Sequence, residues 1–207
     1  MEHHPARMSL ERSYTLLSPF YDLVVARAAF ARARQASLRP LDEVGPSHVL
    51  LSGVGTGLDL PHLPRAHRYV ALDLTRAMLT RALPRRGALD IDWIQGDSEA
   101  LPFGHEVFDH VVLHLIVAVV PHPERVLAEA ARVVKTGGTL LVFDKFLARG
   151  SRSILRRMLS PIASRIATRT DVVFENVLEA VPRLRVVSDE PAFARGWFRL
   201  VRLQKTE

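Results

Sequence analysis

Apolar and polar positions along the chain follow two alternating patterns. After Arg39 and Pro40, short runs rich in Val, Leu and Ile alternate with stretches whose apolar residues recur every three or four positions. The first pattern is typical of buried strands and the second of amphipathic helices. Strands are expected at His48–Ser52, Tyr69–Asp73, Ile91–Gln95, Phe108–His114 and Thr139–Asp144, and helices near Leu58–Leu63, Arg76–Leu83 and Glu124–Val134.

This alternation favours an α/β fold, in which a parallel sheet carries helices on both faces. The segment Lys135-Thr136-Gly137-Gly138 is expected to end the third of these helices, with glycine at its C-cap. A helix at Val172–Ala180 and strands at Leu184–Ser188 and Gly196–Gln204 follow. We therefore predict a Rossmann-like, seven-stranded, mostly parallel sheet that ends in an antiparallel hairpin. Such sheets bind ligands at the carboxyl ends of their strands.

Two further segments are predicted to be helical. The segment Tyr14 to Leu38 has apolar residues on one face, so we expect residues 1–40 to form a helical lid on a domain of residues 41–207. Residues 151–169 carry apolar residues at four-residue spacing among arginines, and Ser160-Pro161 interrupts them. This pattern predicts two short basic amphipathic helices joined by a bend.

Composition restricts the class of protein. A chain of 207 residues with 48% hydrophobic and 24% charged residues is typical of a soluble globular domain. The N-terminus lacks the apolar core of a signal peptide, and the longest apolar run, Val111 to Val120, is too short to span a bilayer. The absence of cysteine excludes disulfides, a thiolate nucleophile and a cysteine-ligated zinc site. We expect a cytoplasmic protein without a metal site.

The net charge of +6 comes almost entirely from arginine. From Lys145 to Thr170 the chain contains no acid, and this stretch includes Arg152, Arg156, Arg157 and Arg165. Such a basic stretch could contact an anionic membrane surface, which would make the protein peripheral on the inner face of the membrane. The alternative is that the apolar stripe covers the sheet and the arginines are solvated. A nucleic-acid partner is disfavoured because the chain has no aromatic-rich basic strand.

Three alternate glycines follow the first predicted strand. At Gly53, Gly55 and Gly57 the backbone could approach a ligand that a Cβ atom would keep away. Asp73 ends the second strand, where a carboxylate can accept hydrogen bonds from both hydroxyls of a ribose. Asp97 follows the third strand and could accept one from an exocyclic amine. Taken singly, each acid is better explained as a helix cap or a solvated loop residue, and only their combination favours a ligand site.

With these residues in this order, the chain resembles the class I S-adenosylmethionine-dependent methyltransferases over nearly its whole length. The resemblance implies S-adenosylmethionine as the cofactor and S-adenosylhomocysteine as the product. It implies that the glycine loop holds the methionine part, Asp73 the ribose, and Asp97 with Ser98 the adenine. Leu74 and Met78 would be apolar neighbours of the adenosine, with core packing as the alternative.

One position departs from the family pattern. The family usually has an acid two residues before the first glycine, where it helps to hold the ammonium group of the cofactor, and this chain has Leu51. The missing acid could weaken cofactor binding by about one charge-assisted hydrogen bond, roughly 1.5–3 kcal/mol. Asp59 or another carboxylate could take its place. The departure also leaves open a non-catalytic adaptor built on a methyltransferase fold.

A narrower resemblance concerns the substrate. The segments Ser52–Pro61 and Val119–Glu124, with Tyr14 and Tyr21 upstream, are similar to the soluble bacterial phosphatidylethanolamine N-methyltransferases and, to a smaller degree, to the ubiquinone/menaquinone C-methyltransferases. The first resemblance implies N-methylation of a phospholipid head group at the membrane surface. The second implies a quinone or another small metabolite as methyl acceptor.

Three residues are candidates for catalysis. The resemblance places Tyr21 and Tyr14 on a helix that covers the site, with Tyr21 nearest the methyl group. His114, at the end of the fourth strand, could act as a base or orient the acceptor. Core packing, or a hydrogen-bonded buried histidine, is the alternative for each. Asp144, at the end of the fifth strand, could face a cationic head group, but a cap of the following turn is favoured.

Overall fold

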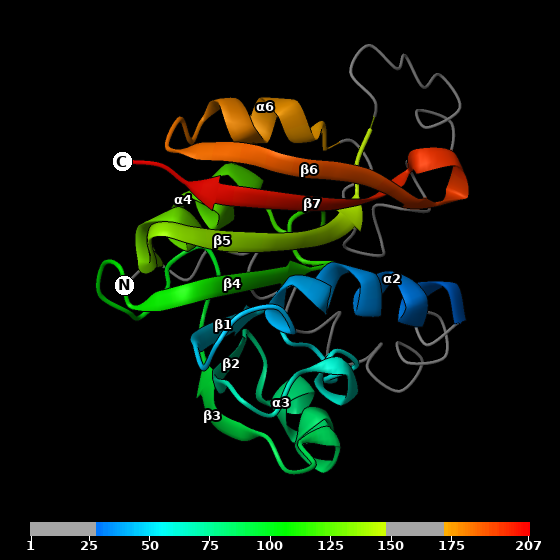
Figure 1. Cartoon of the computed structure of the whole chain (residues 1–207), viewed down its shortest axis with the longest axis vertical. Helices are drawn as coiled ribbons and strands as arrows, with labels where there is room; N and C mark the ends of the chain where they lie inside the picture. The colour runs from blue at the N-terminus through cyan, green and yellow to red at the C-terminus, as the bar shows by residue number, and fades with distance from the viewer. Residues whose placement is uncertain (1–27, 148–171) are drawn as a thin grey trace.

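The computed structural model describes residues 28–147 and 172–207, which form one seven-stranded sheet with helices on both faces (Figure 1). The strand order is β3-β2-β1-β4-β5-β7-β6, and β7 runs antiparallel to both of its neighbours. This confirms the predicted fold class. The strands are β1 (His48–Ser52), β2 (Arg68–Asp73), β3 (Asp90–Gln95), β4 (Phe108–His114), β5 (Val134–Lys145), β6 (Leu184–Phe193) and β7 (Phe198–Lys205).

Helices cover both faces of the sheet because the strands are apolar on both sides. The described α-helices are α2 (Ala28–Leu38), α3 (Arg76–Ala82), α4 (Pro123–Val133) and α6 (Phe174–Glu179). Four short 3₁₀ helices accompany them: η1 (Arg39–Leu41), η2 (Leu60–His62), η3 (Leu83–Arg85) and η4 (Ala194–Gly196). Side chains of α2 and α3 join one buried cluster, whereas those of α4 and α6 join the other.

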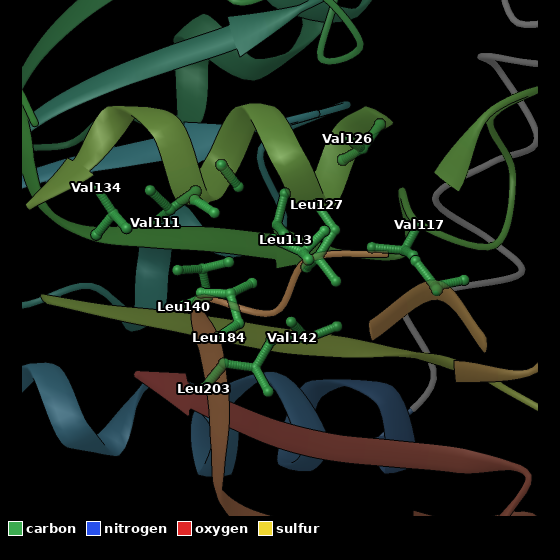
Figure 2. Close-up of a cluster of buried hydrophobic side chains, with 14 of the residues drawn as sticks. Val111, Leu113, Val117, Val126, Leu127, Val134, Leu140, Val142, Leu184 and Leu203 are labelled. Atoms are coloured by element: carbon green, nitrogen blue, oxygen red, sulfur yellow. The ribbon is translucent and has the colours of Figure 1, made fainter. Parts of the chain in front are cut away.

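The larger cluster lies between the sheet and α4. Figure 2 shows Leu113 of β4, Leu127 of α4 and Leu140 of β5 pointing toward one another. Val112, between Val111 and Leu113 on β4, belongs instead to the cluster on the α2 side. Because successive side chains of a strand point to opposite faces, β4 contributes to both cores. The carboxyl end of this central strand is thereby held rigidly next to β1.

The helix predicted at Leu58–Leu63 is wrong. Only the 3₁₀ turn η2 forms there, and Leu63 is extended, with φ −87° and ψ 136°. The reason is Pro64, because a residue that precedes proline is disfavoured in the helical region.

The glycine C-cap predicted for α4 is also wrong. The helix ends at Val133, its cap residue Val134 is extended, and Gly137 and Gly138 lie within β5. A Cβ atom on Gly138 would lie 2.6 Å from the carbonyl oxygen of Asp109, so the glycine permits close approach of β5 to β4.

Two of the predicted segments lie mostly or wholly outside the described residues. The described part of the proposed lid, residues 1–40, begins at α2, which packs on the sheet through Phe30 and Leu38. The basic segment of residues 151–169 falls between Leu147 and Val172, which are joined by a backbone hydrogen bond of 2.9 Å.

Candidate active site

A pocket opens at the carboxyl ends of β1, β2, β3 and β4. It is lined by the loops that follow these strands and by Met78 of α3. The predicted cofactor-binding residues found in its wall are Gly53, Gly55, Asp73, Leu74, Met78, Asp97 and Ser98. The sheet therefore brings together residues that are far apart in the sequence.

The glycine loop after β1 has left-handed backbone geometry. The φ angles are +75° at Gly53, +56° at Gly55 and +78° at Gly57, in a region that side chains rarely adopt. A Cβ atom on Gly53 would lie 2.9 Å from the side chain of Ile116. Gly57 does not line the pocket, and a Cβ atom there would press against Leu60 and Ala82. Gly57 thus lets the loop pack against α3, while the first two glycines form the pocket wall.

Asp73 is fixed in place by two backbone N–H groups. Its Oδ2 accepts a hydrogen bond from the N–H of Gly55 at 2.8 Å, and its Oδ1 accepts one from the N–H of Thr75 at 3.0 Å. Burial raises the pKa of Asp73, against the lowering effect of these hydrogen bonds. Each oxygen keeps a further lone pair, so the carboxylate can still accept from two ligand hydroxyls.

The loop after β3 forms the opposite wall. Asp97 Oδ1 accepts a hydrogen bond from the N–H of Glu99 at 2.8 Å, and the hydroxyls of Ser98 and Ser52 are 2.8 Å apart. Met78 is buried at 3% exposure and lines the pocket from α3. Its position satisfies both expectations for that residue, because it packs in the core and also borders the pocket.

An apolar wall from the β4–α4 connection was missed from the sequence. Leu115, Ile116, Val119, Val120 and Pro121 all line the pocket. Leu115 has φ +58°, a strained conformation for a residue other than glycine, and such strain is often found at functional sites. The sequence feature that could have indicated this wall is the apolar run Val111 to Val120, which continues past the end of β4 at His114.

A smaller pocket adjoins the first along the glycine loop, and we call it the annex. It is lined by Arg34, Asp59 and His114 together with Gly53 to Thr56 and Leu58. Asp59 Oδ1 accepts from Arg34 Nη1 at 2.7 Å and contacts His114 Nδ1 at 2.8 Å. Burial alone would raise the pKa of Asp59, but the guanidinium and the imidazole hold it well below its usual range.

Of the three candidate catalytic residues, only His114 lies in the described part of the structure. His114 lines the annex with its side chain 1% exposed, and both ring nitrogens are occupied, since Nε2 lies 2.9 Å from Ser37 Oγ. Tyr14 and Tyr21 lie outside the described residues, as do Arg152, Arg156, Arg157 and Arg165.

Leu51 carries its side chain into the core instead of the pocket. It is 2% exposed and belongs to the same apolar cluster as Leu38 and Leu41. The usual position of the family's acid is therefore part of the packing beneath α2.

Asp144 acts as a cap, but of the β4–α4 connection and not of the turn that follows it. Its Oδ2 accepts from the N–H of Ala118 at 2.9 Å, and its Oδ1 accepts from the N–H of Lys145 at 2.8 Å. Burial raises the pKa of Asp144 to about 6, despite these bonds. The carboxyl group therefore ties the β4–α4 connection to the end of β5.

The raised pKa predicts a dependence of stability on pH. Because the folded protein binds the proton of Asp144 more tightly than the unfolded chain does, the free energy of unfolding should fall as pH rises from about 4 to about 6. Relative to Asp144→Asn, which cannot titrate, the wild type should lose roughly 2 kcal/mol of stability between pH 4.5 and pH 7.5, because part of the shift is already lost at pH 4.5. Urea denaturation of both proteins at the two pH values measures this. A difference that does not change with pH would contradict the prediction, and the exposed Asp92→Asn serves as the control.

The described residues contain neither a cluster of metal-ligating side chains nor a membrane-spanning helix. Within residues 28–147 and 172–207, no group of three or more His, Cys, Asp or Glu side chains is arranged to hold a metal ion. In the same part of the chain, no helix is long and apolar enough to cross a bilayer.

Comparison with known proteins agrees with this geometry. Residues 50–142 match a family model described as a methyltransferase domain. The chain is 34% identical over 162 residues to a phosphatidylethanolamine N-methyltransferase of Cereibacter sphaeroides, covering 76% of this chain and 79% of that protein. It is 35% identical over 132 residues to a demethylmenaquinone methyltransferase of Renibacterium salmoninarum, covering 62% and 55%.

The fold also has solved counterparts. A crystal structure of an S-adenosylmethionine-dependent methyltransferase from Thermotoga maritima superposes with a TM-score of 0.69 at 20% identity. The superposition covers 95% of this chain and 99% of that chain. At this identity the likeness concerns the fold.

Proposed function

The chain belongs to the class I S-adenosylmethionine-dependent methyltransferases, and from this premise we propose that it methylates the amino group of a phospholipid head group of the phosphatidylethanolamine type. The observation that carries the proposal is the similarity to the Cereibacter enzyme, which extends over 79% of that protein. The similarity to the Renibacterium quinone enzyme covers a smaller share of its length. Membership of an enzyme family argues against the adaptor alternative.

The residues of the pocket fit this cofactor. Asp73 offers two acceptor oxygens for the ribose, and Asp97 with Ser98 offers polar groups for the adenine edge. Gly53 and Gly55 remove side chains from the loop where the methionine part would lie. When bound, S-adenosylmethionine supplies a methyl group already activated on a sulfonium centre.

The contribution of the chain to methyl transfer is to hold the reactants in line and to exclude water. The apolar wall from Leu115 to Val120 suits the second task, because the side chains it presents to the pocket cannot bind water. An amine acceptor must also lose a proton before it attacks. His114 has both nitrogens engaged, so we retain Tyr21 and Tyr14 as the proposed residues near the acceptor.

The carboxyl edge of the sheet has features suited to a membrane surface. Trp197 is 42% exposed and directly precedes Phe198, which pairs with Lys145 at the end of β5. Exposed tryptophan is favoured at membrane–water interfaces. Leu147, which bridges to Val173, precedes in the sequence the basic segment with Arg152 and Arg156. Each arginine near an anionic surface would contribute about 1 kcal/mol. We therefore propose a cytoplasmic enzyme that binds the membrane peripherally.

Methyl transfer to vesicles tests the proposal. With radiolabelled S-adenosylmethionine, we expect label in the lipid fraction when vesicles contain phosphatidylethanolamine and an anionic lipid. Both binding and transfer should decrease as salt rises, because screening weakens the contact with the surface. Vesicles of phosphatidylcholine and the same anionic lipid are the control, since a fully methylated amine cannot accept another methyl group. Absence of both binding and transfer at low salt would contradict the proposal.

A quinone remains the second candidate acceptor, because of the similarity to the Renibacterium enzyme. That function predicts methyl transfer to a demethylmenaquinone in detergent solution, without vesicles. Label that appears in the quinone and not in phosphatidylethanolamine would favour this candidate.

A further inference from the structure

The annex and the larger pocket share the backbone of the glycine loop. Gly53 and Gly55 line both, so a ligand that follows the loop out of the larger pocket reaches Arg34, Asp59 and His114. Arg34 comes from α2, Asp59 precedes η2, and His114 ends β4. Three separate elements therefore direct charged or polar groups to one end of the cofactor pocket.

The bonds within the annex leave some of its polar groups available. Arg34 Nη1 and His114 Nδ1 both bond to Oδ1 of Asp59, and no described residue donates to Oδ2. The Arg34 side chain is 6% exposed, and its Nε atom is buried without a hydrogen-bond partner. If Asp59 served only to join α2 to the glycine loop, its Oδ1 contacts with Arg34 and His114 would be sufficient. The pair thus keeps one acceptor, Asp59 Oδ2, and one donor, Arg34 Nε, without a described partner, and a zwitterion needs one group of each kind.

We propose that the annex binds the amino-acid end of S-adenosylmethionine. Asp59 Oδ2 accepts from the α-ammonium group, and Arg34 donates to the α-carboxylate. The inference rests on the methyltransferase function, and it assigns to Asp59 the role that Leu51 does not fill. Because Arg34 with Asp59 and the ligand's zwitterion each carry no net charge, binding adds no net charge to a buried site.

His114 is a positioning residue in this scheme. Its bonds to Asp59 and to Ser37 Oγ orient the carboxylate so that Oδ2 remains available. Ser37 belongs to α2, as Arg34 does. Ligand binding in the annex would therefore engage α2 together with the glycine loop.

Calorimetry with two ligands tests the role of Asp59. S-Adenosylhomocysteine carries the amino-acid end, whereas 5′-methylthioadenosine lacks it and keeps the ribose and adenine. We expect Asp59→Asn to weaken S-adenosylhomocysteine binding roughly 10- to 100-fold and to leave methylthioadenosine binding unchanged. Asp92→Asn, the same chemical change at an exposed carboxylate, should alter neither affinity.

The possible outcomes are distinct. Equal weakening of both ligands in Asp59→Asn would overturn the inference, because Asp59 would then act through the shape of the loop. Weakening of neither ligand would also overturn it, while the cofactor assignment would stand. If the wild type binds neither ligand, the methyltransferase function fails together with the inference.

A measurement on the wild type avoids any dependence on how well the variant folds. Backbone amides of α2, residues Ala28–Leu38, should exchange more slowly with S-adenosylhomocysteine than with methylthioadenosine, since only the first ligand reaches Arg34. Equal protection by the two ligands would contradict the inference. For Arg34 itself, decarboxylated S-adenosylhomocysteine should bind the wild type more weakly than the complete ligand, and Arg34→Lys should reduce that difference. Equal wild-type affinity for both compounds would overturn the assignment of the carboxylate.

Discussion

Asp73→Asn is expected to lower the affinity for S-adenosylhomocysteine by about 100-fold or more. The carboxylate would lose its charge and one acceptor oxygen, and two charge-assisted hydrogen bonds to ribose hydroxyls are worth roughly 3 kcal/mol or more. The substitution would also place an amide NH₂ group against the N–H of Gly55 or Thr75, which the carboxylate oxygens accept from now. Calorimetry measures the loss directly.

The same titrations with methylthioadenosine distinguish Asp73 from Asp59. Methylthioadenosine keeps the ribose, so Asp73→Asn should weaken both ligands, whereas Asp59→Asn should weaken only the one with the amino-acid end. Asp92→Asn again provides the matched control, because its carboxylate is exposed on β3 and pairs with Arg68. Retention of wild-type affinity within two-fold in Asp73→Asn would exclude Asp73 as the ribose acceptor.

Arg34→Met is expected to lower the free energy of unfolding by about 3–5 kcal/mol. Both partners of the ion pair are nearly buried, with side-chain exposures of 6% for Arg34 and 8% for Asp59. Removing the guanidinium leaves a buried carboxylate with His114 as its remaining partner. The variant also loses the cation–π contact of Arg34 with Phe143, in which the guanidinium carbon lies 6.0 Å from the ring centroid. Urea denaturation measures the effect.

Arg68→Met is the matched control for this experiment. Its ion pair with Asp92 joins side chains that are 64% and 58% exposed, and exposed pairs contribute at most about 1 kcal/mol. Adding Asp59→Leu to Arg34→Met should recover part of the lost stability, because the uncompensated charge is removed. A cost for Arg34→Met no greater than that of Arg68→Met would refute the buried-pair interpretation.

The positions of the central strands along the chain could be predicted because their signals are local. The strands β1 and β4 have the bounds expected from their apolar runs, His48–Ser52 and Phe108–His114. The helix expected at Leu58–Leu63 failed because of Pro64, which lies just beyond the window. The glycines at 137 and 138 were misinterpreted because their reason, the approach to the Asp109 carbonyl, is a contact between strands.

In the candidate site, too, the residues with local signals could be predicted and those that depend on distant contacts could not. The glycine loop, Asp73 and Asp97 each stand at a strand end, so the sequence order was enough to bring them together. Arg34 lies 25 residues from Asp59 in the chain and Ser37 lies 77 residues from His114, and no periodicity connects such pairs. The annex could therefore not be predicted, although Asp59 itself was considered as a substitute for the missing acid.

The burial of Leu51 limits the paths by which this sequence could change. An acid restored at that position would enter the apolar cluster with Leu38 and Leu41, where a carboxylate has no partner and its desolvation is costly. Loss of Asp59 would in turn leave Arg34 unpaired. Each change alone would leave a buried charge without its partner, so we expect that the usual family arrangement would need compensating substitutions in β1, α2 and the glycine loop.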